Sequence, residues 1–235
     1  MWIPPEGARK QARWVGRRMW MHGVVAVSVC FLVSSGAQAA LITFALSIEI
    51  SEATPPEGPI PWMVATFDDD DDQGSVDLRL EATNLVDNEF AFEWLFNLDP
   101  DLESELTSLV FTEVEGSRIG EFLGPWIYTS ADAFQADGDG LFDIQFAFST
   151  HFAASRRFGA GEAVEYTITG IPTLTAASFD FPSAMGGEEG VYPTAAHVGG
   201  IGPDDDLSGW ISVPDPATLS ILGIGGLALF RRKRR

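Results

Sequence analysis

The sequence contains almost no cysteine, lysine or histidine. Cys30 is the only cysteine among 235 residues, and it lies in an apolar run near the N-terminus. If that run is removed during export, the remaining chain has no thiol, which excludes disulfides, cysteine nucleophiles and cysteine metal ligands. Lysine is absent from residues 41–230, and His151 and His197 are the only histidines there. Any catalytic chemistry would therefore depend mainly on carboxylates.

The motifs of common enzyme classes are also missing. The chain has no G-x-S-x-G, H-E-x-x-H or P-loop spacing, and its two internal histidines lie in different segments. Paired carboxylates can hydrolyse glycosides, but residues 41–213 contain 32 acidic side chains, so some close pair is expected by chance. We therefore predict that the protein is not an enzyme, with a glycoside hydrolase as the alternative.

Positive charge is scarce and is concentrated at the two ends. The whole chain has 14 Lys and Arg against 34 Asp and Glu, which gives a formal net charge of −20. Residues 40–213 keep 4 basic and 32 acidic residues, a formal charge of −28. The four basic residues are Arg79, Arg118, Arg156 and Arg157. A surface this acidic repels phosphate backbones, so nucleic acid is excluded as a partner.

Residues 1–39 have the pattern of a secretory signal peptide. A basic stretch precedes an apolar run over residues 23–33, and small residues then end in Ala37-Gln38-Ala39. This is the order of an n-region, an h-region and an A-x-A cleavage site. We predict that signal peptidase recognises Ala37 and Ala39 and cuts after Ala39. The alternative interpretation of the apolar run is a buried helix.

Residues 213–235 combine a proline motif, a short apolar segment and a basic tail. Two prolines around Asp215 keep that strip extended. The next 14 residues, 217–230, would form a helix about 21 Å long, which is shorter than the roughly 30 Å hydrocarbon core. The tail consists of Arg231, Arg232, Lys233, Arg234 and Arg235. Since such cations stay on the cytoplasmic side, we predict a short transmembrane helix with the acidic body outside; the alternative is a plain stalk before a tail anchor.

This C-terminal order resembles a known sorting signal. The motif Pro214, Asp215 and Pro216, the Gly- and Leu-rich apolar segment and the arginine cluster are similar to the PEP-CTERM signal, also catalogued as the ice-binding protein C-terminal domain. The family pattern has Pro-Glu-Pro, and Asp215 keeps the carboxylate between the prolines. The resemblance implies export by a Gram-negative bacterium, a transient inner-membrane intermediate, and cleavage near the motif by an exosortase. It further implies release or attachment at the cell surface.

Between the two ends, residues 40–212 are predicted to form an exported acidic β domain. Apolar and polar residues alternate, as in strands with one buried side, along Thr43–Ile50, Ser75–Leu80, Phe142–Phe148 and Val164–Thr169. Further strands are expected at Pro61–Phe67, Phe90–Leu98, Leu109–Val114, Ala177–Phe181 and Gly209–Val213. Many short strands separated by Gly, Pro and Asp turns predict an all-β fold, an antiparallel β-sandwich or jelly roll.

One acidic stretch resembles half of a calcium-binding loop. Asp137, Asp139 and Asp143 have the spacing of carboxylate ligands around a glycine turn. Gln135 and Phe146 occupy the positions of two strong ligands, so we expect calcium to bind only weakly. The alternative is an acidic turn that leads into a strand. No other cofactor is predicted.

Together these patterns predict a non-enzymatic protein of the cell surface or extracellular matrix, associated with biofilm exopolysaccharide. Its partners during processing would be signal peptidase, the inner membrane and an exosortase. The alternative function is a carbohydrate-binding module or weak glycosidase that acts on exopolysaccharide and is stabilised by calcium. Exposed tryptophans among Trp62, Trp94, Trp126 and Trp210 would stack on sugar rings, although buried tryptophans are the commoner case in a sandwich.

Overall fold

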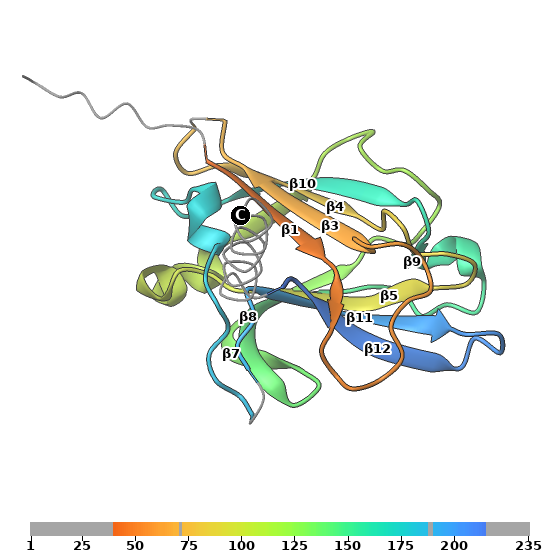
Figure 1. Ribbon diagram of the computed structural model, residues 1–235. Helices are drawn as coiled ribbons and strands as arrows, with labels where there is room; N and C mark the ends of the chain where they lie inside the picture. Colours follow the sequence, from red (N-terminus) through yellow and green to blue (C-terminus); the bar gives the residue numbers. More distant parts are fainter. Residues whose placement is uncertain (1–39, 71, 188–189, 215–235) are drawn as a thin grey trace, which may run out of the picture. The chain divides into compact units, whose positions relative to one another are not determined.

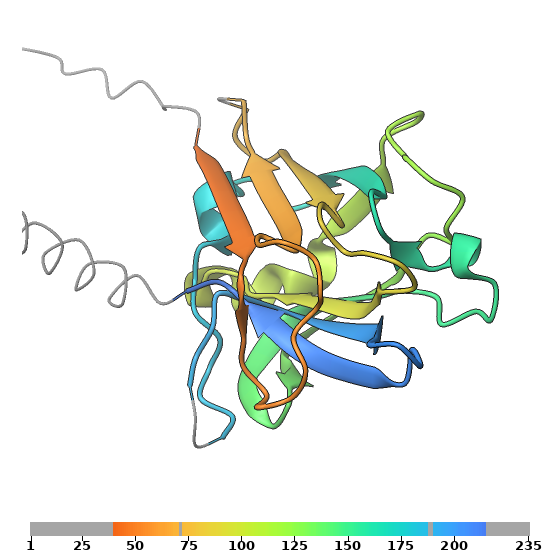
Figure 2. The same cartoon turned by 45° about the vertical axis from the view of Figure 1, so that its right-hand side comes forward.

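Residues 40–70, 72–187 and 190–214 are described by the computed structural model, and they form two antiparallel sheets (Figures 1 and 2). One sheet has five strands in the order β1 (Leu41–Leu46), β3 (Met63–Asp68), β4 (Val76–Glu81), β10 (Ala163–Thr169) and β6 (Val110–Glu113). The other has seven, in the order β2 (Ile48–Glu49), β12 (Leu207–Ser212), β11 (Thr194–Ile201), β5 (Phe90–Phe96), β8 (Asp139–Ala147) and β7 (Trp126–Ala136), with β9 (Phe158–Gly159) paired to β5. The prediction of a mostly β, antiparallel body is confirmed.

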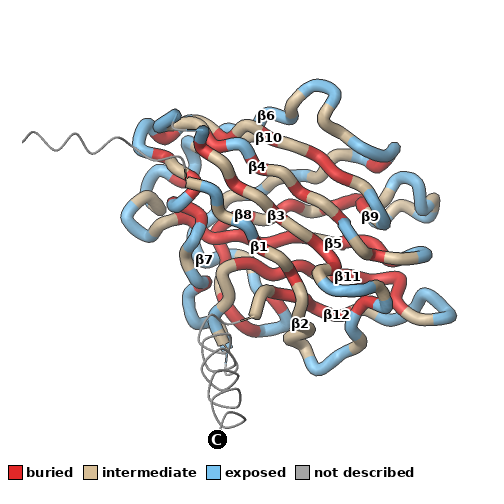
Figure 3. The backbone as a smooth tube through the Cα atoms, turned by 45° about the horizontal axis from the view of Figure 1, so that its top comes forward, coloured by how far each residue is buried: buried red, intermediate tan, exposed pale blue. Residues whose placement is uncertain are grey.

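Alternation of apolar and polar residues determines which side of each strand is buried. In β3, Met63, Ala65 and Phe67 are buried, whereas the residues between them are only half-buried (Figure 3). The same period-two pattern holds in β4 and β10, where every second side chain is buried. The buried sides of the two sheets contribute to one core cluster, so the sheets stabilise each other.

Phenylalanine rings join the two sheets across this core. Phe67 of the five-stranded sheet meets Phe96 of the seven-stranded sheet edge to face, with ring centroids 5.3 Å apart. Phe146 of β8 contacts Tyr166 of β10 at 5.6 Å and Phe111 of β6 at 5.6 Å. Such ring pairs stabilise a core by more than the burial of their apolar area alone. This explains why many phenylalanines lie between the two sheets.

The structure corrects two of the predicted strands. The segment Ala177–Phe181 is not a strand, because Ala176–Phe179 form the 3-10 helix η3, and Thr175 and Ser178 cap its start reciprocally. The segment Thr43–Ile50 is not one strand but two, β1 and β2, which belong to different sheets. The chain changes sheets at Ser47, whose backbone N–H donates to the carbonyl of Ser212 in β12.

Three strands, β7, β9 and β11, were not predicted from the sequence. β11 has two alanines and two glycines among its eight residues, β9 is only two residues long, and β7 has no regular alternation of apolar residues. The pairing of β7 with β8 shifts register between Thr129 and Phe134. Beyond this irregularity, Phe134, Ala136 and Phe142 pack with Leu95 and Trp210 in a second, smaller apolar cluster. The far end of the β7–β8 hairpin therefore leaves the main core.

Two 3-10 helices besides η3 connect the described strands, η1 (Pro100–Ser108) and η2 (Ala154–Arg156). No helix within the described residues has the length and apolar character needed to cross a membrane. The predicted signal peptide, residues 1–39, and the predicted membrane segment, residues 217–230, lie outside the described residues.

Candidate functional site

The predicted calcium ligands lie in and after the turn of the β7–β8 hairpin. Asp137 and Gly138 are the two central residues of that turn, because Ala136 pairs directly with Asp139. Their φ angles are +47° and +85°. A turn with positive φ at both central residues is of type I′, for which Asp-Gly is a preferred sequence. The spacing that resembles a calcium loop thus also fits a tight hairpin.

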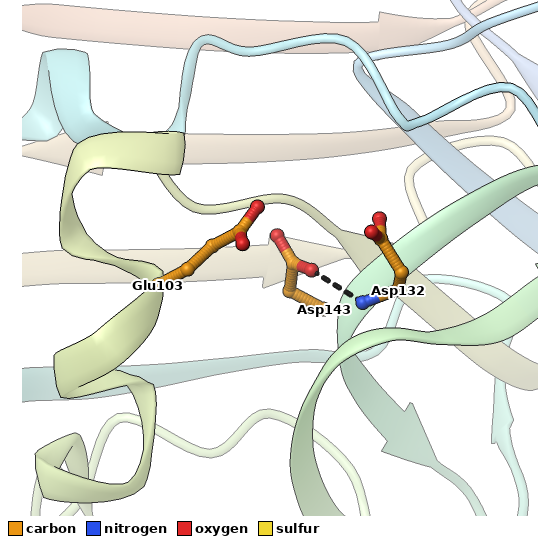
Figure 4. Close-up of side chains that lie close together, drawn as sticks. All are labelled: Glu103, Asp132 and Asp143. Carbon is orange, nitrogen blue, oxygen red and sulfur yellow. Dashed lines mark hydrogen bonds between the residues drawn. The ribbon is translucent and has the colours of Figure 1, made fainter.

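The structure brings Asp143 together with Glu103 and Asp132 rather than with Asp137 and Asp139. One carboxylate oxygen from each of these three residues lies within 4.8 Å of the others (Figure 4). Glu103 comes from η1, Asp132 from the irregular part of β7 and Asp143 from β8. Sequence spacing could not reveal this acidic cluster, since its members come from three separate elements.

Asp143 is buried and both of its carboxylate oxygens accept backbone hydrogen bonds. Oδ2 accepts from the N–H of Leu98 at 3.0 Å, and Oδ1 accepts from the N–H of Asp132 at 2.9 Å. Asp132 has a positive φ of 52°, which is typical of a residue in a bulge or turn. Asp143 therefore ties the irregular part of β7 to the end of β5, and this role explains its burial without a ligand.

Electrostatics in the acidic cluster favour protonation or a cation. Burial raises the pKa of Asp143, while the hydrogen bonds from Leu98 and Asp132 oppose this shift. Burial, followed by the charges of Asp143 and Asp132, raises the pKa of Glu103. Three carboxylate oxygens at this separation are the ligand type that Ca²⁺ takes. The cluster is the only group of three metal-ligating side chains among the described residues.

A second candidate site lies on the side of the seven-stranded sheet that faces away from the main core. Strand register places Trp210, His197, Glu93, Ala147 and Trp126 opposite one another, in a row across β12, β11, β5, β8 and β7. The adjacent row ends in Gln145 of β8 and Tyr128 of β7. We call the outer aromatic face the set Phe92, Glu93, Trp126, Tyr128, Gln145, Ala147, His197 and Trp210.

Stacked rings fix the geometry of the outer aromatic face at one end. The ring of His197 stacks on Trp210 with centroids 4.8 Å apart and an angle of 9°. On its other side it meets the ring of Phe92 at 4.7 Å. Glu93 Oε1 lies 3.9 Å from His197 Nδ1, and the other carboxylate oxygen accepts a hydrogen bond from Gln145. A carboxylate, an amide and an imidazole are thus held beside flat rings.

Burial shifts the pKa of both titratable groups on this face. It raises the pKa of Glu93, with the hydrogen bond from Gln145 opposing the shift. It lowers the pKa of His197 from 6.5, with the charge of Asp137 opposing the shift. His197 is therefore neutral at pH 7, and its contact with Glu93 is a polar contact rather than an ion pair.

The other end of the outer aromatic face is exposed. The residue exposures of Trp126 and Tyr128 are 59% and 50%, and both lie on the edge strand β7. Trp62, Trp94 and Trp210 are buried, at 8% exposure or less. Of the four tryptophans considered from the sequence, Trp126 alone is thus available to a ligand.

A small polar cavity lies at the start of β5. Its volume is about 160 Å³, and its lining includes Glu89, Phe90, Arg157 and Glu162. The guanidinium of Arg157 sits over the ring of Phe90, 4.4 Å from its centroid. Since small-molecule sites have volumes of about 300–1,000 Å³, this cavity is too small for a typical organic ligand.

The predicted processing residues lie mainly outside the described part of the chain. Pro214 is half-buried, and Val213 alone separates it from Ser212, the last residue of β12. Asp215, Pro216, the basic residues 231–235, Ala37 and Ala39 are not among the described residues.

Comparison with known proteins adds no assignment. No family model matches the chain, and no curated protein or solved structure is significantly similar to it. The resemblance of residues 213–235 to the PEP-CTERM signal therefore stays a prediction from the residues themselves.

Proposed function

We propose that this protein is a non-enzymatic component of the bacterial surface or extracellular matrix whose β-sandwich domain binds exopolysaccharide through the outer aromatic face. The observation that supports the binding role is the alignment of exposed Trp126 and Tyr128 with Glu93, Gln145 and His197. Aromatic rings offer flat apolar surfaces to the C–H faces of sugars, and carboxylate and amide groups hydrogen-bond to hydroxyls.

The dimensions of this face suit an extended polymer. Buried Trp210 closes one end of the row, so the accessible part runs from His197 to Trp126 and crosses four neighbouring strands. With strands about 4.8 Å apart, this part spans roughly 14 Å, which is the length of about three sugar rings. The net charge of the domain favours neutral or cationic polymers, because an acidic surface repels polyanions.

The face supports binding rather than hydrolysis. Glycosidases use two carboxyl groups about 5–5.5 Å apart for retention or about 6.5–9.5 Å apart for inversion. The two rows of the outer aromatic face supply Glu93 alone as a carboxylate. For this reason a glycoside hydrolase is the weaker proposal.

Delivery to the surface rests on the pairing of a signal peptide with the proline motif and basic tail. In this proposal, signal peptidase removes residues 1–39 and an exosortase cleaves near Pro214. Both basic ends remain with the cytoplasmic side, so the exported domain keeps its full acidity. Fractionation of exosortase-positive cells with mass spectrometry tests this step. An intact Arg231–Arg235 tail in the surface-bound protein would contradict exosortase processing.

Binding is tested by pull-down of the purified full chain on exopolysaccharide from the producing cells. We expect Trp126→Ala and Tyr128→Ala to weaken binding at least about tenfold, since aromatic anchors dominate most interfaces. Phe152→Ala is the matched control, because Phe152 is an aromatic residue 87% exposed outside this face. Equal binding by all three variants and the wild type would exclude the outer aromatic face as the binding surface.

A further inference from the structure

A buried carboxylate holds the first described residue of the chain. Asp69, which follows β3, is only 6% exposed. Its Oδ1 accepts a hydrogen bond from the backbone N–H of Ala40 at 2.8 Å, and its Oδ2 accepts from the N–H of Ala176 at 3.0 Å. Asp69 therefore joins the start of β1, the β3–β4 connection and η3. Figures 1 and 2 show the start of β1 and this connection at the same end of the five-stranded sheet.

This carboxylate has two amide donors but no cation. No Arg or His of the described ranges forms an ion pair with Asp69. The residue also lies inside the run Asp68–Asp72, whose charges repel one another. Buried charges in proteins are normally paired, because an isolated ionised carboxylate loses most of its solvation. A cation at the position of Ala40 N would supply the missing partner.

The nitrogen atom that Asp69 holds is the one that signal-peptide cleavage after Ala39 would release. Hydrolysis of the Ala39–Ala40 peptide bond adds hydroxide to the carbonyl carbon of Ala39 and a proton to the nitrogen of Ala40. The product is an α-amine, which is protonated at neutral pH because its pKa is about 8. The donor at 2.8 Å from Asp69 Oδ1 would then carry a positive charge.

We propose that Asp69 is the acceptor site for the new N-terminus, so that processing turns an amide–carboxylate hydrogen bond into a buried ion pair. Cleavage then stabilises β1 in the five-stranded sheet, and the exported domain reaches its full stability only after the signal peptide is removed. This inference rests on the proposed export and on cleavage after Ala39. It does not depend on saccharide binding.

The proposal is tested by a double-mutant cycle between cleavage and Asp69. The full chain with Ala37→Leu and Ala39→Leu keeps its signal peptide, since signal peptidase needs small residues there. Asp69→Asn is then introduced into both the cleavable and the uncleavable chain. Loss of the Ala176 hydrogen bond is common to both and cancels in the cycle. We expect Asp69→Asn to raise the unfolding equilibrium constant at least about tenfold more in the processed protein, because there it leaves a buried ammonium group without its counter-charge, whereas in the unprocessed chain it only weakens a hydrogen bond from a neutral amide.

Asp70→Asn provides the matched control, because it removes the same charge from an exposed position one residue away. An equal effect of Asp69→Asn on processed and unprocessed protein would overturn the proposal. A mature N-terminus other than Ala40, determined by mass spectrometry, would also overturn it. Neither result bears on the binding of exopolysaccharide by the outer aromatic face, which the pull-down measures separately.

The lack of lysine permits a second measurement, which uses the wild-type protein and therefore does not depend on whether a variant folds. Residues 40–214 contain no lysine, and Lys233 is the only one after them. In the processed protein an amine-selective acetylating reagent can therefore modify only the α-amine and, where the tail is retained, Lys233. We expect acetylation of Ala40 to be at least about tenfold slower in the native protein than in urea, as for other groups that react only after local opening. Equal rates in the native and unfolded states would show that the amine is free, contrary to the proposal.

Discussion

The outer sides of the two sheets carry charge in different ways. On the five-stranded sheet, Arg79 lies between Glu81 and Glu165, and about a third of each side chain is exposed. On the seven-stranded sheet, the side chains of Glu93 and His197 are 23% and 27% exposed and adjoin aromatic rings. The first arrangement neutralises charge in water. The second keeps a carboxylate in partly apolar surroundings, which costs solvation. Ligand sites often contain such shifted groups, so the comparison favours the seven-stranded sheet as the functional side.

The largest effect is expected where the two sheets depend on each other. Phe146 is fully buried and contacts Phe96 in its own sheet and Tyr166 in the other. Phe146→Ala should lower the free energy of unfolding by about 3–5 kcal/mol, because it leaves a cavity between the sheets. Urea titration followed by tryptophan fluorescence and by far-ultraviolet circular dichroism measures the loss. Coincident transitions by both probes indicate that the sheets unfold together.

Phe152→Ala is the control for this substitution, because Phe152 is largely exposed and should change stability by no more than about 0.5 kcal/mol. Two separate transitions in the wild type would show instead that each sheet unfolds alone. In that case the effect of charges on the outer side of each sheet would have to be measured from the unfolding transition of that sheet alone.

The sequence predicted the regular strands well because burial on one side leaves a period-two pattern. β4 has this pattern throughout and β10 has it from Val164 on, and both were predicted within one residue of their observed ends. The pattern does not show where a chain leaves its sheet. Thr43–Ile50 alternates without interruption, yet its two halves pair with different sheets at Ser47. That division depends on the hydrogen bond to Ser212, which is 165 residues away along the chain.

Candidate sites were harder to predict, because they depend on cross-strand register. The spacing of Asp137, Asp139 and Asp143 suggested one cation site, but β8 separates Asp143 from the turn. Glu103 and Asp132 have no local pattern that would join them to Asp143. On the outer aromatic face, Trp126 and His197 lie in one row across the sheet. They do so only because of the register in which β11, β5, β8 and β7 pair. Neither β7 nor β11 was predicted from the sequence.

An intermediate effect is expected at the irregular part of β7, where the pairing with β8 shifts register between Thr129 and Phe134. Asp143→Ala removes the acceptors of Leu98 N–H and Asp132 N–H. Since the N–H of Leu98 is buried, its loss of a partner should cost about 1–3 kcal/mol. Thermal unfolding measures this change, and Asp139→Ala serves as the comparison from the predicted calcium set. An unchanged Tm for Asp143→Ala would mean that the irregular part of β7 keeps its structure without this carboxylate.

Calcium titration of the same proteins separates the two sets of carboxylates. A calcium-dependent rise in Tm reports binding to the folded state. If Asp139→Ala removes the rise, the set predicted from the sequence holds the ion. If Glu103→Gln removes it and Asp139→Ala does not, the ion belongs to the acidic cluster of Glu103, Asp132 and Asp143.

The smallest effects, those of single charges, test the contrast between the two outer sides directly. Burial raises the pKa of Glu93 above its ordinary value of 4.5. Its contribution to stability is therefore present below pH 4.5 and is lost as the pH rises through the higher folded-state pKa. Burial lowers the pKa of His197 below 6.5, so its contribution is present above pH 6.5 and is lost as the pH falls through the lower folded-state value.

We expect Glu93→Gln to reduce the loss of stability above pH 4.5, with the remainder due to the raised pKa values of Asp143 and Glu103, while His197 still destabilises the protein on acidification. Glu165→Gln on the five-stranded sheet should leave both pH-dependent changes in place. Its cost should be about 1 kcal/mol or less and should fall with added salt, because its ion pair with Arg79 is partly exposed. Urea titrations across this pH range, at low and high salt, measure both variants. A salt-sensitive loss for Glu93→Gln, or a changed pH profile for Glu165→Gln, would show that the two outer sides do not differ in how they hold charge.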